Sequence, residues 1–269
     1  MRLLGINTIC SAFGITLDEN LEIIKAAGFD CVFSTFTRDF PVSAAVKKAE
    51  SLGLKYETLH APFGRCGLRE NLNSMWLCGE NGDEYLKLLF ECVDACSHNG
   101  IEKCVLHNAV SELPPPVSDV GKSRFKRLFD YAESKNVHMA VENLESTEHL
   151  SCLMDMAGGF HGFCWDCGHN LCYTPFDDIP ALYGNRMICT HVDDNRGITR
   201  PGVIHYTDDL HLMPFDGSLD WDWYAEKIKG CGYTGPLTLE LKGDYTHLGA
   251  ESFYREAYKR VLKLCEMCR

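Results

Sequence analysis

Short apolar runs alternate with longer amphipathic segments along the whole chain. Eight such runs stand out, at residues 3–6, 31–33, 56–59, 104–106, 139–141, 162–165, 187–189 and 237–239. Between them, apolar residues recur at helical spacing, as in segments 85–96 and 125–132. Short continuous runs are typical of buried strands, and helical spacing is typical of amphipathic helices. The pattern therefore predicts parallel strands joined by crossover helices.

Glycine-containing turn signals stand before several predicted strands, where a helix must end. Examples are AAGFD, SLGLK, HNGIEK and GCGYTGP. Eight strand–helix units in 269 residues predict an α/β fold, a (β/α)8 TIM barrel that forms a single domain over residues 1–269. The alternative is a doubly wound sheet. It would carry Gly-x-Gly-x-x-Gly after its first strand, and the sequence has none there.

Two loop-like stretches, 111–119 and 193–217, follow the fourth and seventh predicted strands. Both fall on the side of a barrel where loops connect the end of a strand to the next helix. Barrels enlarge loops on that side when they build an active site. We therefore expect function at the carboxyl ends of the strands.

Composition and charge narrow the class of partner. The chain has 26 Lys and Arg against 38 Asp and Glu, a net charge of −12, which argues against a nucleic-acid partner or an anionic membrane. No uninterrupted apolar stretch approaches the length of a membrane span. The start MRLLGINTIC lacks a sustained apolar segment, so we expect a cytoplasmic protein whose 15 cysteines are reduced and mostly buried.

Six consecutive predicted strands, the third to the eighth, end in a side chain able to bind a metal. These residues are His60, His107, Glu142, Asp166, His191 and Glu240. Because the carboxyl ends of barrel strands converge on one mouth, we expect these groups to lie close together. One such residue alone would be ordinary, but six in succession predict a metal site. Mixed nitrogen and oxygen ligands suit Mn, Zn, Fe or Co better than an all-oxygen Mg or Ca site.

The segment CWDCGH, residues 164–169, contains both a Cys-x-x-Cys and an Asp-x-x-His. Side chains alternate along a strand, so Cys164 shares a face with Asp166 and lies one layer deeper in the barrel. Cys167 is expected to pack in the following loop. The segment is therefore predicted to act through Asp166, with two thiols flanking it, rather than as a redox pair.

The sequence resembles the xylose isomerase-like TIM barrels, which include sugar phosphate isomerases and epimerases and, as a relative, endonuclease IV. The resemblance covers most of the chain and is carried by LHAPFG at 59–64, VLHNA at 105–109, VENLES at 141–146, WDCGH at 165–169, THVDDNRG at 190–197 and DLHLMPFDGSLDW at 209–221. Each motif is weak alone, and their order is specific.

In the ketose epimerases of this family, one divalent metal is held by Glu, Asp, His and Glu from strands five to eight. The resemblance implies that Glu142, Asp166, His191 and Glu240 hold such an ion here, with Mn, Zn, Co or Mg as candidates and Zn or Mn favoured. It also implies that Glu142 and Glu240 act as acid and base on a sugar, sugar phosphate or keto-sugar. Proton removal next to a carbonyl, with the enediolate stabilised by a Lewis acid, is the corresponding chemistry.

Further residues are expected to bind this small-molecule substrate. They are His60, His107, Glu148, His169 and Arg196. Oligomer formation is common in the resembling family, so a homo-oligomer is possible by analogy.

Two other functions remain open. Endonuclease IV uses a three-metal site, and this sequence supplies a matching order of ligands if His60, His107, His169, Asp209 and His211 join the four above. A zinc phosphodiesterase is therefore one alternative, although the predicted mouth loops contain few cations to meet phosphates. A lyase or dehydratase is the other, because loss of a β-hydroxyl uses the same metal and base.

Overall fold

A computed structural model describes residues 2–269. Eight parallel strands form one sheet in the order β7-β6-β5-β4-β3-β2-β1-β8. A parallel bridge between Val192 and Leu239 joins the two ends of that order and closes the barrel. The predicted (β/α)8 barrel is confirmed, and each predicted apolar run coincides with a strand. The strands are β1 Leu4–Asn7, β2 Cys31–Thr35, β3 Lys55–His60, β4 Lys103–His107, β5 His138–Glu142, β6 Gly162–Asp166, β7 Met187–His191 and β8 Leu237–Leu239.

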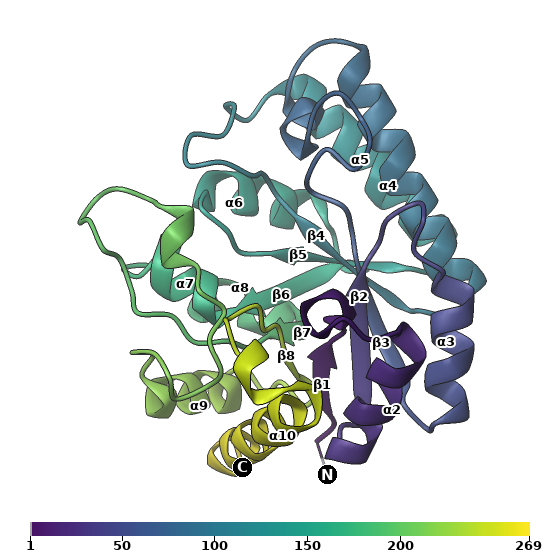
Figure 1. Ribbon diagram of the computed structural model, residues 1–269. Coiled ribbons are helices and arrows are strands. Elements are labelled where there is room, and N and C mark those ends of the chain that lie inside the picture. The colour runs from purple at the N-terminus through teal and green to yellow at the C-terminus, as the bar shows by residue number, and fades with distance from the viewer. Residues whose placement is uncertain (1) are drawn as a thin grey trace.

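Helices surround the strands (Figure 1). The α-helices are α1 Cys10–Phe13, α2 Leu17–Ala27, α3 Val42–Ser51, α4 Glu80–His98, α5 Asp119–Ser134, α6 Thr147–Met156, α7 Cys167–Tyr173, α8 Ile179–Tyr183, α9 Trp221–Gly230 and α10 Ala250–Met267. Short 3-10 helices are η1 Leu72–Trp76, η2 Gly184–Arg186, η3 Tyr206–Asp208 and η4 Thr246–Leu248. Within residues 2–269, none of these helices combines the length and apolar character needed to cross a bilayer.

Helix starts follow ordinary capping chemistry. Thr16 and Glu19 form a capping box at α2, in which each side chain accepts from the other's backbone N–H. The hydroxyl of Ser118 accepts from the Gly121 N–H at the start of α5. Gly121 is required here for a second reason, because a Cβ on it would lie 2.1 Å from the ring of Trp76. Trp76 is buried against this helix and has a packing role.

The inside of the barrel is filled by small side chains. Val105, Ala140, Cys164 and Cys189, from four neighbouring strands, form a buried cluster separate from the larger core between helices and sheet. Cys164 therefore occupies the interior layer below Asp166, as alternation along the strand predicts.

The two thiols that flank Asp166 are not paired with each other. Cys167 is the buried first residue of α7, and its Sγ donates to the backbone oxygen of Asp193. All fifteen cysteines are free thiols.

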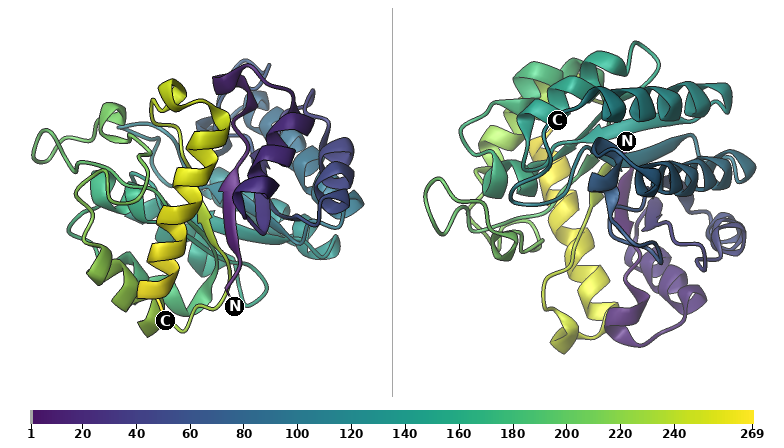
Figure 2. Two further views of the ribbon diagram at one scale, coloured as in Figure 1. Left: turned by 60° about the horizontal axis from the view of Figure 1, so that its bottom comes forward. Right: turned by 90° about the horizontal axis from the view of Figure 1, so that it is seen from above.

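The long connection between β7 and α9 is organised by one buried carboxylate. Asp194 accepts hydrogen bonds from the backbone N–H groups of Phe215 and Gly217 and from the indole of Trp221. A Cβ at Gly217 would lie 2.2 Å from an oxygen of Asp194, so only glycine fits. This anchoring gives the loop a defined course over the mouth. At the opposite end of the barrel, β1 begins and α10 ends side by side (Figure 2).

Candidate functional site

The side chains that end strands β3 to β8 meet at one mouth of the barrel. His107 pairs with Glu142 across β4 and β5, and Asp166 pairs with His191 across β6 and β7. The backbone beyond the strands is held by asparagine side chains. Asn143 donates to the backbone oxygen of Asp166 and accepts from its N–H, which extends the sheet-like pairing by one residue.

Glu142 lies at the centre of a group of histidines. Its Oε1 is 2.7 Å from Nδ1 of His191. Its Oε2 is 3.3 Å from Nε2 of His60 and 3.1 Å from Nε2 of His107. Glu142 and His60 are almost fully buried, so these contacts form in the absence of bulk water. Nδ1 of His60 lies 2.7 Å from the Ala61 carbonyl, which leaves Nε2 as the ring nitrogen that faces the carboxylate.

Four side chains converge most closely. Nδ1 of His191 lies 3.0 Å from Oε2 of Glu240 as well as close to Glu142. One potential ligand atom from each of four residues lies within 4.8 Å of the others, and we call these residues the four-residue cluster: Glu142, Asp166, His191 and Glu240. They are the four that the resemblance implied as metal ligands.

Asp166 is held in place by its neighbouring helix. It caps the N-terminus of α7, where its Oδ1 accepts from the His169 N–H at 2.6 Å. Its other oxygen, Oδ2, is buried and has no hydrogen-bond partner within the described structure. A buried carboxylate oxygen without a hydrogen-bond partner is costly, so this atom is a candidate ligand for a cation.

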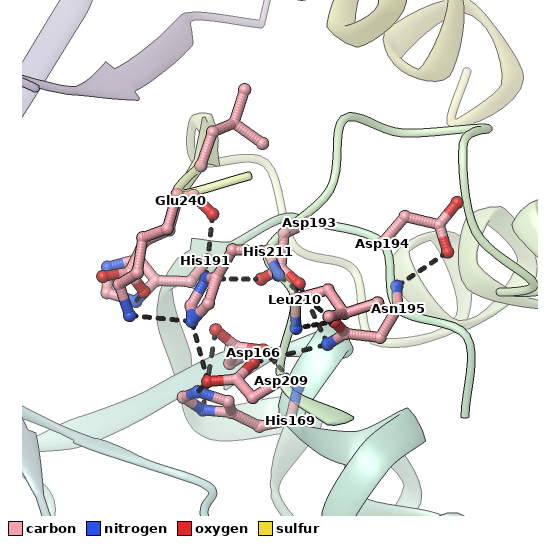
Figure 3. A network of polar contacts seen from close by, with 12 residues as sticks. Asp166, His169, His191, Asp193, Asp194, Asn195, Asp209, Leu210, His211 and Glu240 are labelled. Atoms are coloured by element: carbon pink, nitrogen blue, oxygen red, sulfur yellow. Dashed lines mark hydrogen bonds and ion pairs between the residues drawn. The ribbon is translucent and has the colours of Figure 1, made fainter. Parts of the chain in front are cut away.

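A second group lies beside the first, on the side of the long loop (Figure 3). Oδ2 of Asp209 is 2.9 Å from Nε2 of His211 and 3.5 Å from Nε2 of His169. These three residues, which we call the loop-side cluster, also offer ligand atoms within 4.8 Å of one another. The candidates for a multinuclear site are therefore brought together as well.

Asn195 fixes the backbone of the loop-side cluster. Its Oδ1 accepts from the N–H groups of Leu210 and His211. Its Nδ2 lies 3.4 Å from Oδ1 of Asp209. This anchor stabilises His211 in an uncommon backbone conformation, with φ of 46°.

Two charged residues of the mouth were not expected from the sequence. Nζ of Lys242 lies 2.8 Å from Nε2 of His211. The Asp193 carboxylate is fully buried, with Oδ2 3.5 Å from Nδ1 of His211. Each residue follows a predicted ligand by two positions, Lys242 after Glu240 and Asp193 after His191. Alternation of side chains along a strand was the signal that could have identified both.

A cavity of about 370 Å³ opens above these groups. Its wall includes His107, His169, Asp209, Glu240 and Lys242, together with Glu145 and an apolar and aromatic rim of Phe63, Val110, Leu144, Tyr173 and Tyr206. Concave sites with aromatic walls and a few convergent polar groups are typical of small-molecule binding.

Two residues expected to bind substrate lie elsewhere. Glu148 is exposed in the first turn of α6, and Arg196 is exposed in the loop after β7. Neither is among the described residues that line the cavity, so their role in substrate binding stays a prediction. Glu145 is the acidic residue of that region that does line the cavity.

The crowding of charge shifts several pKa values. Burial alone would raise the pKa of Glu142, but the charge of His191 and the contacts with His107 and His60 hold it well below its usual range. Burial, and next the charge of Asp193, raise the pKa of Asp166 well above its usual range. Without a bound cation, the carboxylates of this mouth therefore do not ionise independently.

Histidines of the mouth shift in opposite directions. Burial lowers the pKa of His107 to about 4. Burial also opposes a charge on His169, but Asp166 and Asp209 outweigh it and raise the pKa of His169 to about 10. Near neutral pH, His169 therefore carries a proton that His107 lacks.

The four-residue cluster fits a divalent metal ion by its donor set. It offers one imidazole nitrogen and three carboxylate oxygens, a mixture that suits Zn, Mn or Co. Oδ2 of Asp166 would gain the partner it lacks, and an ion would offset the repulsion among three buried acids.

Comparison with known proteins identifies the family of this chain. Residues 21–264 match the family described as xylose isomerase-like TIM barrel, and the chain belongs to that family. A relative in Sinorhizobium fredii (strain NBRC 101917 / NGR234), the uncharacterized protein y4fM, is 34% identical over 93% of this chain and 88% of its own length.

Solved structures of sugar epimerases and of a zinc-bound protein share the fold. The IOLI protein with a bound zinc atom has a TM-score of 0.75 at 18% identity, over 98% of each chain. The D-allulose 3-epimerase of Methylomonas sp. in complex with D-allulose has a TM-score of 0.71 at 14% identity, over 100% of this chain and 98% of that one.

Proposed function

We propose that this protein is a divalent-metal-dependent isomerase or epimerase of a sugar, sugar phosphate or keto-sugar. The observation that carries the proposal is the four-residue cluster, in which two buried glutamates both approach Nδ1 of His191, at 2.7 and 3.0 Å. That arrangement provides a metal-ligand set and two candidate proton carriers at the same point. The cavity above it is of a size that suits a small polar substrate.

In this proposal Glu142, Asp166, His191 and Glu240 hold one ion, with Zn or Mn favoured. Bound there, the ion supplies Lewis acidity toward a carbonyl oxygen and a neighbouring hydroxyl of the substrate. Glu142 ends β5 and Glu240 follows β8, and β6 and β7 lie between these two strands in the closed barrel. The two glutamates therefore reach the mouth from different directions. One carboxylate removes the proton next to the carbonyl, and the other returns a proton to the same carbon or to the neighbouring one.

Other residues of the mouth would bind and orient the substrate. His107 and His169 line the cavity, and His60 lies behind His107 with ring centroids 4.8 Å apart. Phe63 stacks on His107 with centroids 4.3 Å apart and offers an apolar wall to the carbon face of a sugar. Among the residues that line the cavity, the cations come from Lys242 and the histidines, so the wall favours hydroxyl groups over several phosphates.

Proton exchange with solvent tests the proposal directly. A panel of keto-sugars and sugar phosphates is incubated in D₂O with the Zn- or Mn-loaded protein, and deuterium next to the carbonyl is followed by NMR. We expect exchange that requires both metal and Glu240. Failure of every sugar to exchange, under conditions where metal is bound, would contradict the proposal.

The loop-side cluster supports a second candidate, a phosphodiesterase of the endonuclease IV kind. Its three ligand atoms lie within 4.8 Å of one another beside the first cluster. Cleavage of an abasic-site DNA duplex, with no exchange of sugars, would favour this alternative. A lyase on the same scaffold would instead release a dehydrated product, which the same NMR measurement detects.

A further inference from the structure

The loop-side cluster has the ligand types of a second metal site but also has a charged neighbour. The neighbour is Lys242, which lies beyond the end of β8, two residues after Glu240. Its Nζ lies 2.8 Å from Nε2 of His211. Nε2 of His211 also lies 2.9 Å from Oδ2 of Asp209.

We infer that the ammonium group of Lys242 takes the place of a second metal ion, so that the mouth binds one ion per chain. This inference rests on the proposed metal site at the four-residue cluster. It assigns to Lys242 a positioning role that nothing in the sequence motifs indicated.

The geometry of His211 leaves a single nitrogen available for an ion. Nδ1 of His211 lies 3.0 Å from the backbone oxygen of Glu240, and a carbonyl can only accept, so Nδ1 carries the proton. Nε2 therefore remains as the nitrogen that could ligate, once it gives up the hydrogen that it donates to Oδ2 of Asp209. A zinc ion would have to lie about 2.0–2.1 Å from this nitrogen, in the space beside Nε2 that the Lys242 ammonium already approaches.

The backbone holds Lys242 beside His211. The N–H of Lys242 donates to the carbonyl of His211 at 3.2 Å. The preceding residue, Leu241, exchanges two hydrogen bonds of 3.0 Å with the side chain of Asn7. The Lys242 side chain is exposed to solvent at the mouth, but these hydrogen bonds hold its backbone beside the loop-side cluster.

Charge balance favours the ammonium over a second ion. Asp209 is the acid of the loop-side cluster and already faces His169 and His211. The ammonium of Lys242 adds positive charge 2.8 Å from Nε2 of His211, and a dication placed against it would be repelled at short range. The four-residue cluster has no lysine in such contact among the described residues, and it keeps three carboxylates for one ion.

Metal counting tests the inference without reference to activity. The protein is stripped with a chelator, dialysed against Zn²⁺ or Co²⁺, and its bound metal is measured by elemental analysis, with the visible spectrum of the Co²⁺ form as a second readout. We expect one ion per chain in the wild type and in Lys242→Arg, and two in Lys242→Met. The double variant Lys242→Met/Asp209→Asn should return to one, which locates the added ion at the loop-side cluster.

Matched controls separate this effect from a general loss of positive charge. Lys126→Met, on the exposed face of α5, should keep one ion. Lys242→Ala provides a second neutral variant, and circular dichroism checks the fold of each protein. Two or more ions in the wild type would overturn the inference, and so would a single ion in folded Lys242→Met and Lys242→Ala.

The outcomes also distinguish this inference from the proposed function. A wild type that binds one ion but exchanges no sugar protons would remove the isomerase proposal and leave the role of Lys242 intact. A wild type that exchanges sugar protons but binds two ions would do the reverse.

Discussion

Buried carboxylates occur at both ends of this barrel, and their partners differ in kind. At the end where the strands begin, Glu57 on β3 is 1% exposed and lies between two lysines. Nζ of Lys103 contacts its Oε1, and Nζ of Lys55 lies 3.2 Å from its Oε2. At the mouth, Glu142 is at least as deeply buried, but its close neighbours are His60, His107 and His191.

The difference separates a structural ion pair from a candidate site. Lysine is charged at neutral pH, so Glu57 is compensated by the chain itself. Lys103 also donates to the backbone oxygen of Ile188 across the barrel, which ties three strands together. At the mouth, Glu142 and Glu240 share one close histidine, His191, so the three acids of the four-residue cluster remain short of positive charge. Deep burial of an acid therefore indicates a functional site only where neighbouring cations do not already neutralise it.

The largest effect is expected at the mouth. Glu142→Gln keeps the size of the side chain but removes a base, and we expect the rate of sugar proton exchange to fall by about 10²–10⁴-fold. Some stability should be lost as well, because the neighbouring histidines stabilise the ionised form of Glu142, so exchange is compared per folded molecule. Deuterium exchange and thermal unfolding measure the two quantities on the same sample. Exchange at the wild-type rate would exclude Glu142 as a proton carrier.

The opposite pattern is expected at the other end of the barrel. Lys103→Met leaves the buried Glu57 with one lysine partner, the exposed Lys55. We expect a loss of about 3–5 kcal/mol in the free energy of unfolding. Activity per folded molecule should be unchanged. Urea unfolding gives the first quantity, and the double variant Lys103→Met/Glu57→Met should recover most of the stability. A fall in exchange rate without loss of stability would contradict this division between the two ends.

Metal removal should destabilise the protein through the mouth alone. A ligand present at about 100 times its Kd raises the free energy of unfolding by about 2.7 kcal/mol. A chelator should remove this contribution and thereby lower the melting temperature. Asp166→Asn should remove most of the difference between metal-loaded and metal-free protein, because it alters the ligand with an unpartnered oxygen. Lys103→Met should preserve the difference in full. An equal metal-dependent shift in Asp166→Asn and wild type would place the ion elsewhere.

The smallest effect concerns a buried histidine outside both regions. Neutral His161 accepts from the Met139 N–H at Nδ1, and its Nε2 lies 3.0 Å from the Phe129 carbonyl. Burial lowers its pKa to about 4, so between pH 6.5 and 4 the unfolded chain binds the extra proton. Its contribution is therefore complete above pH 6.5 and lost as the pH falls. We expect at most about 2 kcal/mol less stability at pH 5 than at pH 7 from this group.

Urea unfolding at the two pH values measures this contribution. His161→Gln should reduce the pH dependence, while His247→Gln, an exposed histidine on η4, should leave it unchanged. Equal pH dependence in wild type and His161→Gln would show that other groups account for the acid sensitivity.

Much of the fold could be predicted because its signals are local. Each apolar run became a strand, and the strand-end positions of Glu142, Asp166, His191 and Glu240 followed from parallel geometry alone. The position of Cys164 in the CWDCGH segment was also predictable, since alternation along β6 directs it into the barrel below Asp166. Motif spacing alone could not predict the exposure of Glu148, which lies in the first turn of α6, and its role in substrate binding stays a prediction.

The sequence by itself determined the barrel, the order of its strands and the residue types at its mouth, because periodicity and strand alternation depend on near neighbours in the chain. Only the tertiary structure decided which charges meet. Lys242 and His211 are 31 residues apart, and their contact depends on the anchoring of β8 by Asn7 and of the long loop by Asn195. Likewise, the histidine partners of Glu142 and the lysine partners of Glu57 come from other strands. Such contacts arise when the barrel closes, and no local pattern encodes them.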